Sequence, residues 1–170
     1  MKEIFGREII ELNKVVKFVN KSPNPDPQYA KEGDSGFDLR AWITEEESES
    51  IDELCITLKP LERRLIHTGL YFELPKDTEG QVRSRSGCSL KQGLIVLNSP
   101  GTIDSRFRGE VGIIAINLSN EEIKIKNSER IAQMVICPVF CKEYVNLIKQ
   151  EIIDKNTERG DEKFGSTGIN

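Results

Sequence analysis

The stretch that most constrains this 170-residue chain lies near its middle, where a turn-rich segment joins two strand-like apolar runs. The runs are residues 93–97 and 111–116, and both are rich in Ile, Val and Leu, which is typical of buried strands. Pro100 and Gly101 are turn residues, so we expect a hairpin with a tight tip. Asp104 would lie on that hairpin beside backbone left uncovered by glycine, where a carboxylate can hold a water next to a small planar ligand. Taken alone, this residue is better explained as the capping aspartate of a surface turn.

Composition indicates a single globular domain that can bury a core. Apolar residues make up 37% and charged residues 31% of the chain, as in ordinary globular proteins. The net charge of −4 argues against binding nucleic acid through bulk charge. No apolar run is long enough to span a membrane, and the N-terminus lacks a secretory apolar region. We therefore expect a cytoplasmic protein with no nucleic-acid partner and no membrane partner.

The cysteines and the single histidine argue against two kinds of chemistry. Cys137 and Cys141 have no matching second pair, and His67 is the only histidine, so we expect no zinc site. Free thiols are the expected state of all four cysteines. A Ser-His-Asp or Cys-His mechanism would have to use His67, which lies in a strand-like run and is better explained as a structural residue.

The remaining pattern is one of short strands separated by turn signals. No segment with helical periodicity dominates, so the sequence favours an all-β barrel or sandwich. One short helix is expected, capped by Ser84 or Ser86, running through Leu90 and ended by Gly93. The expected strands include residues 15–19, 37–39, 123–126, 130–136 and 145–153, with further strands between 58 and 74.

Three other stretches combine polar residues with strand or helix ends. Asp38 alternates with apolar neighbours, and Gln133 interrupts an apolar strand where its amide needs a partner. Arg85 lies next to a helix start, whose free N–H groups suit a phosphate. Each has a structural explanation of its own: a strand-end acceptor, a glutamine bonded to backbone, and a capped turn with a surface arginine.

Together, these stretches resemble the five signatures of the trimeric dUTP pyrophosphatases, or dUTPases, in the family's order. Any one of them is weak evidence, whereas the ordered set covers nearly the whole chain and is highly specific. In this sequence the resembling stretches are residues 34–39, 85–87, 98–110, 130–134 and 159–168.

The resemblance implies a distorted jelly-roll barrel that forms a homotrimer with active sites at the subunit interfaces. Residues 1–14 would be an N-terminal arm, 15–153 the barrel domain, and 154–170 a flexible tail that closes over the active site. In such a trimer the hairpin comes from one chain, the phosphate-binding stretches from a neighbour, and the tail from the third.

The implied reaction is hydrolysis of dUTP to dUMP and pyrophosphate by water attack on the α-phosphorus. Asp104 would orient and deprotonate the water. Mg2+ would be held by the substrate phosphates, with Asp38 contacting it through a water. The implied substrate-binding residues are Arg85, Ser86, Gly87, Asn98, Gly101, Thr102, Ile103, Phe107, Gly112, Gln133, Arg159, Phe164, Gly165, Ser166 and Thr167.

The resemblance also gives individual roles to several of these residues. Backbone at residues 101–103, with the Asn98 side chain, would match the edge of uracil. Phe107 would lie against the sugar and exclude a 2′-hydroxyl. Phe164 would stack over uracil when the tail closes, and Arg159 would reach the γ-phosphate.

Two alternatives belong to different functional classes. The related dCTP deaminases share the fold and an Ile-Asp hairpin, but they use a Glu three residues before an Asn in the following strand. Here the asparagine is Asn117 and the corresponding position is Ile114, so deamination is disfavoured. The second alternative is a catalytically silent nucleotide-binding module, against which the intact Asp104 argues.

Overall fold

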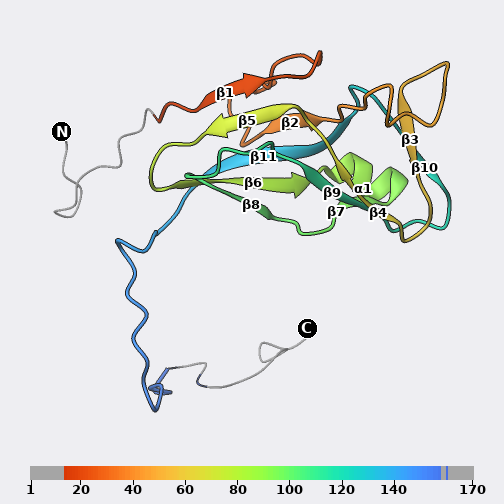
Figure 1. The fold of residues 1–170 in the computed structure, drawn as a ribbon. Coiled ribbons are helices and arrows are strands. Elements are labelled where there is room, and N and C mark those ends of the chain that lie inside the picture. The colour runs from red at the N-terminus through yellow and green to blue at the C-terminus, as the bar shows by residue number, and fades with distance from the viewer. Residues whose placement is uncertain (1–13, 158–159, 161–170) are drawn as a thin grey trace. The chain divides into compact units, whose positions relative to one another are not determined.

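The computed structural model describes residues 14–157 and residue 160, and short β-strands dominate this part of the chain (Figure 1). The all-β prediction is therefore confirmed. In chain order, the elements of the described residues are β1 (Lys17–Asn20), β2 (Phe37–Arg40), β3 (Cys55–Leu58), β4 (Arg63–Ile66), β5 (Leu70–Glu73), β6 (Thr78–Ser84), α1 (Ser86–Gln92), β7 (Leu94–Val96), β8 (Gly101–Asp104), β9 (Ile113–Asn117), β10 (Ile123–Lys126) and β11 (Arg130–Pro138).

These strands pair antiparallel into four sheets. The largest has the order β2-β11-β6-β8, and the others are β4-β9-β7, β1-β5 and β10-β3. In Figure 1 the blue ribbon of β11 runs between β2 and β6, as this order requires. Strands distant in sequence thus become neighbours, which brings the separated polar stretches onto one sheet.

The core is built from one side of each strand, because successive side chains of a strand point to opposite faces. In β10, for example, Ile123 and Ile125 are buried whereas Lys124 and Lys126 are exposed. Fully burying an Ile or Leu side chain contributes roughly 1.5–3 kcal/mol. The largest fully buried apolar side chains are Leu39, Leu58, Ile66, Leu94, Ile113, Ile125, Ile131 and Met134.

The central segment is not the tight hairpin tip that the sequence predicted. The flanking strands β7 and β9 do pair, with Leu94 opposite Asn117. However, Gly101–Asp104 leaves that sheet and pairs as β8 with the edge of β6, where Val82 lies opposite Gly101. The extended backbone satisfies its N–H and C=O groups on that edge, which a tight tip could not provide.

The strand predicted over residues 145–153 is wrong. The chain divides into two compact units, Met1–Val139 and Phe140–Asn170, and the described residues of the second unit contain no strand or helix. Apolar side chains such as Leu147 and Ile152 are exposed there. A strand needs a partner for its backbone groups, and the described part of this unit offers none. The domain limits at residues 14 and 153 stay predictions.

Two further sequence expectations can be compared with the structure. All four cysteines are free thiols, as predicted. Within the described residues, no helix has the length and apolar character needed to cross a membrane.

Candidate active site

One face of the β2-β11-β6-β8 sheet, called here the outer face, collects most of the polar residues singled out in the sequence. At one end, Asp38 of β2 lies opposite Gln133 of β11, which lies opposite Arg83 of β6. At the other end, Glu79 of β6 lies opposite Asp104 of β8. Directly opposed residues of antiparallel strands point to the same side, so these side chains share one surface.

The two ends of the outer face are far apart within one chain. Cys137, which lies opposite Glu79, is four positions along β11 from Gln133, and this is roughly 13 Å at the usual strand rise. Strand β8 also lies two strands from β11, a lateral distance of roughly 10 Å. Asp104 is therefore distant from the Asp38 end, which we call the anion end because its arginines face a shared hollow.

The anion end consists of Asp38, Arg85, Arg130 and Gln133, and a shared carboxylate organises it. The Arg85 Nε donates to Asp38 Oδ1 at 2.7 Å, and the Arg130 Nη1 donates to Asp38 Oδ2 at 3.2 Å. The Arg85 Nη1 also donates to the Arg130 carbonyl at 3.1 Å. Two guanidinium cations on one carboxylate leave this group with a net positive charge, which suits an anionic ligand.

Gln133 has the partner that its place in an apolar strand demanded. Its Nε2 donates to the Ser84 carbonyl at 3.0 Å, which is the backbone-bonded alternative considered from the sequence. The bond fixes the amide beside Asp38 on the outer face. Contact between Gln133 and a ligand stays a prediction.

Helix α1 begins and ends as predicted, but its capping differs. Arg85 occupies the N-cap position and no side chain caps the helix, so the prediction of a Ser84 or Ser86 cap is wrong. The Ser84 hydroxyl instead accepts the Val96 N–H at 2.9 Å, which ties the segment to β7. Gly93 ends the helix with a φ of 74°, a left-handed conformation that favours glycine. Ser86 is exposed at the first turn.

A hollow of about 310 Å³ lies beside α1 at the anion end. Its lining includes three cationic side chains and one carboxylate, that of Glu129. A larger hollow of about 860 Å³ lies over β3 and β4, and its lining includes none of the residues predicted from the sequence. The residues lining the smaller hollow are Arg85, Gly87, Cys88, Lys91, Gln92, Glu129 and Arg130.

Residues 98–112, called here the nucleotide loop, carry Asp104 at the exposed end of β8. β8 is the last strand of its sheet, so one backbone edge of this strand is not used by the sheet ladder. Gly101 is buried, and a Cβ there would lie 3.1 Å from the Asn98 Nδ2. A side chain at this position would require the Asn98 amide to shift by a few tenths of an ångström, so glycine favours this close approach of Asn98 to the backbone. The same strand supplies Thr102 and Ile103.

Beyond Asp104 the nucleotide loop turns back on itself. The Phe107 N–H donates to the Asp104 carbonyl at 3.0 Å, and the residue Phe107 is 43% exposed. This leaves the ring accessible for the contact predicted with the sugar. Gly112 lies at the end of the loop against the Leu65 side chain, and its predicted contact with substrate stays a prediction.

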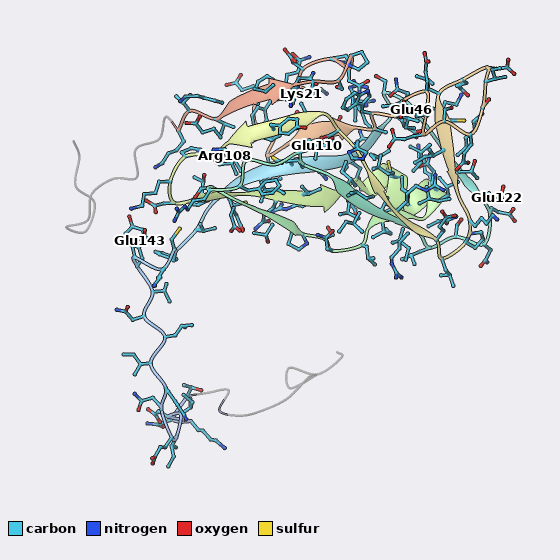
Figure 2. The ribbon with its side chains drawn as sticks, viewed as in Figure 1. Lys21, Glu46, Arg108, Glu110, Glu122 and Glu143 are labelled. Atoms are coloured by element: carbon cyan, nitrogen blue, oxygen red, sulfur yellow. The ribbon has the colours of Figure 1, made fainter. Side chains whose placement is uncertain are left out.

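Glu110 anchors the end of the nucleotide loop (Figure 2). Its Oε1 accepts the Thr68 N–H at 3.0 Å and the Gly69 N–H at 2.8 Å, and its Oε2 lies 3.0 Å from His67 Nδ1. Burial raises the pKa of Glu110, but the hydrogen bonds from Gly69, His67 and Thr68 together lower it by more. The pKa of this carboxyl group therefore lies below its ordinary value. This contact agrees with the structural role expected for His67.

Sequence reasoning missed Glu110 and Arg130 as residues of this site. A usable signal existed for Arg130, because two consecutive apolar residues, Ile131 and Ala132, separate it from Gln133 and break the strand alternation. Glu110 ends the resembling stretch 98–110, but its role as an anchor could not be predicted, because its partners are mainly backbone N–H groups of a turn 41 and 42 residues away.

The tail residues predicted to close over the site lie outside the described residues, and their roles stay predictions. They are Arg159, Phe164, Gly165, Ser166 and Thr167.

Comparison with known proteins shows which family this chain belongs to. A family model described as dUTPase matches residues 22–168. The chain belongs to the dUTPase family. It is 51% identical over 144 residues to the deoxyuridine 5′-triphosphate nucleotidohydrolase of Clostridium novyi (strain NT), covering 84% of this chain and 90% of that one. The corresponding enzyme of Finegoldia magna is 47% identical over 153 residues, covering 90% and 98%.

The fold agrees with this family assignment. A mutant of the Staphylococcus bacteriophage 80alpha dUTPase, solved with dUpNHpp, superposes with a TM-score of 0.73 at 26% identity, covering 91% of this chain and 99% of that one. The resemblance stated from the five signatures is therefore confirmed at the level of family and fold.

Proposed function

We propose that this chain is a dUTP diphosphatase, which hydrolyses dUTP to dUMP and pyrophosphate. The observation that carries the proposal is the pair of polar ends on the outer face, in a chain of the dUTPase family. One end presents the exposed carboxylate of Asp104 beside an open strand edge. The other presents Arg85 and Arg130 around a hollow that suits phosphate.

In the proposed reaction, Asp104 acts as the general base. A water held by its carboxylate attacks the α-phosphorus, the new oxygen–phosphorus bond forms, and the bond to the bridging oxygen of the leaving pyrophosphate breaks. The proton released by the water goes to the carboxylate. This role requires Asp104 to be accessible, and its exposed position at the end of β8 supports it.

The phosphates would be held by the side chains of Arg85 and Gln133 and by Ser86 and Gly87 at the first turn of α1. Fixing the phosphates aligns the leaving group opposite the attacking water. Three of these residues lie in or beside the segment between β6 and α1, so one short stretch sets most of the geometry.

Mg2+ is the proposed metal, bound chiefly by the substrate's phosphate oxygens. The described residues contain no cluster of three or more side chains suited to hold a metal. Asp38 fits a water-mediated contact, because its two oxygens accept bonds from arginines but retain lone pairs for a metal-bound water. When bound, Mg2+ would offset the charge that develops on pyrophosphate.

Base selection would come from the nucleotide loop. Uracil presents one N–H between two carbonyls, and the open backbone edge of β8 with the Asn98 amide can match that pattern. Cytosine would leave buried polar groups unpaired, at a cost on the order of 1–3 kcal/mol per group. Phe107 would lie against the sugar and exclude a 2′-hydroxyl.

The site would be completed by other copies of the chain in a homotrimer. Asp104 and the anion end are too far apart in one chain to act on the same chain of three phosphates, and this separation supports a shared site. The tail, through Arg159 and Phe164, would close the site from the third copy. We place the activity in the cytoplasm, because four free thiols suit a reducing compartment.

The proposal is tested by measuring pyrophosphate and ammonia release from dUTP, dCTP, dTTP and UTP in the presence of Mg2+. We expect pyrophosphate from dUTP, little from the other three nucleotides, and no ammonia from dCTP. Ammonia release would instead favour a deaminase, although Ile114 occupies the position of its carboxylate. Binding of dUTP without pyrophosphate release would favour a silent binding module.

A further inference from the structure

A β-bulge in β11 decides which way Arg130 points. The pairing of β11 with β2 shifts register between Arg130 and Ala132, so Ile131 is the extra residue. Strict alternation from the outward Gln133 would turn Ile131 outward and Arg130 inward. Instead Ile131 and Ala132 are both buried, with exposures of 2% and 0%, and Arg130 returns to the outer side. Bulges commonly re-aim a side chain in this manner beside active sites.

The bulge lets Arg130 hold the Asp38–Arg85 pair from both sides. Its guanidinium donates to Asp38 Oδ2 at 3.2 Å, so it fixes the carboxylate. Its carbonyl accepts the Arg85 Nη1 at 3.1 Å, so it also fixes the far end of the Arg85 guanidinium. The Cys88 Sγ lies 3.5 Å from the same carbonyl, which links this arrangement to α1.

We propose that Arg130 is a positioning residue that holds Arg85 in the orientation needed to bind the substrate's phosphates. This inference rests on the proposed function, because Arg85 is the phosphate-binding side chain in that proposal. It adds Arg130 to the site and assigns a structural role to the bulge at Ile131, which turns Arg130 toward Asp38.

The physical argument is one of preorganisation. A free arginine side chain samples many rotamers, and ordering it costs up to about 2 kcal/mol. Arg85 is already ordered by contacts to Asp38 and Arg130 before any ligand arrives. A guanidinium has five N–H donors, so these contacts can orient the group and still leave it able to bind phosphate. Substitution of the Arg130 side chain keeps the backbone carbonyl but removes one of the donors to Asp38 Oδ2, so the carboxylate that orients Arg85 would be held less firmly.

The test is a double-mutant cycle between Arg130→Gln and Arg85→Gln, assayed by pyrophosphate release from dUTP. We expect Arg130→Gln alone to lower kcat/KM about tenfold. In the Arg85→Gln background it should lower kcat/KM by less than about twofold, because the side chain that Arg130 is proposed to position is already gone. Arg130→Lys keeps the charge but lacks the planar guanidinium, so it should restore little of the loss.

Two further measurements separate positioning from a general structural role. Binding of deoxyuridine, which has no phosphates, should be unchanged in Arg130→Gln, whereas binding of dUpNHpp should weaken. Arg63→Gln at an exposed position of β4 is the matched control for loss of a positive charge away from the hollow; it should change kcat/KM less than Arg130→Gln does. If Arg130→Gln fails to fold, Arg130→Lys carries the same cycle.

The inference is overturned if Arg130→Gln leaves kcat/KM unchanged, or if its effect is equally large with and without Arg85. Equal weakening of deoxyuridine and dUpNHpp binding would also overturn it. These results differ from a failure of the proposed function, in which the unmodified protein would release no pyrophosphate from dUTP.

Discussion

The anion end and the nucleotide loop are held in place by different forces. At the anion end, side chains from β2, the segment before α1, and β11 are cross-linked to one another through Asp38. The nucleotide loop keeps its key carboxylate, Asp104, exposed at a strand end. It is fixed instead at its base, where Glu110 accepts backbone N–H groups. The comparison indicates that side chains proposed to bind phosphate can be paired with one another beforehand, whereas the carboxylate proposed to take a proton from water has to remain exposed.

The largest effect on turnover is expected at Asp104, the exposed carboxylate of the nucleotide loop. Asp104→Asn removes the proton acceptor but keeps the shape of the side chain, so turnover should fall roughly 10²–10⁴-fold. Binding of dUpNHpp, measured by calorimetry, should persist. The matched control is Asp52→Asn on an exposed loop residue, which should turn over dUTP normally. Unchanged turnover in Asp104→Asn would discard the base assignment.

The tail should matter for rate rather than for assembly. Deleting the residues after Asn156 removes Arg159 and Phe164, which are proposed to act only on closing, so turnover should fall tenfold or more, a rough figure for loss of a closing segment. The unfolding temperature and the oligomeric mass should stay the same. A truncated protein with the rate of the full chain would contradict the role given to the tail.

A moderate loss of stability is expected at the base of the nucleotide loop. Glu110→Ala leaves the partly buried N–H groups of Thr68 and Gly69 without their acceptor, at a cost of about 2 kcal/mol. For a chain of this size the unfolding temperature should fall by roughly 4–8 °C. Glu110→Gln keeps an acceptor oxygen and serves as the control. Equal unfolding temperatures for Glu110→Ala and Glu110→Gln would show that these bonds contribute nothing.

The same carboxylate predicts how stability depends on pH. The pKa of Glu110 is lowered in the folded protein from an ordinary value of 4.5, so the unfolded state binds its proton first as pH falls. Its contribution is present above about pH 4.5 and is lost as pH falls through the lower folded pKa. Denaturant titrations from pH 6 to pH 3 should therefore show a steeper loss for the unmodified protein than for Glu110→Gln. Parallel curves would contradict this.

The smallest effect is expected for an ion pair with no part in either region. Lys17 and Glu73 lie 3.0 Å apart, and both side chains are more than half exposed. Exposed pairs of this kind contribute little because water and salt screen them. Lys17→Ala should leave both the unfolding temperature and the dUTP turnover unchanged within error. A clear loss of turnover would show that β1 contributes to the site in a way the comparison omits.

For both regions, the sequence predicted which residues belong to them better than it predicted which strands pair and which side chains bond to one another. The alternation of apolar residues in strands such as β10 is local, so the all-β fold followed from it. The placement of residues 101–104 was wrong because pairing with β6 depends on which strand edge is open in three dimensions. The strand over 145–153 failed for a related reason, since apolar composition alone supplies no hydrogen-bonding partner.

In the candidate site, too, the residues were predicted better than the bonds between them. Asp38, Arg85 and Gln133 were chosen from short motifs, and the structure brings them together at one end of the outer face. The salt bridge between Asp38 and Arg130 joins residues 92 positions apart, which no local pattern encodes. The capping prediction for α1 failed because the Ser84 hydroxyl bonds to β7 instead.

The most direct test of the account is complementation between two inactive chains. Asp104→Asn and Arg85→Ala proteins would be unfolded, mixed in equal amounts and refolded together, and dUTP turnover compared with each protein refolded alone. If the nucleotide loop of one copy acts with the anion end of another, about a quarter of the sites combine two intact regions and activity returns to about that fraction. If both regions of a site belonged to one chain, the mixture would be as inactive as its components.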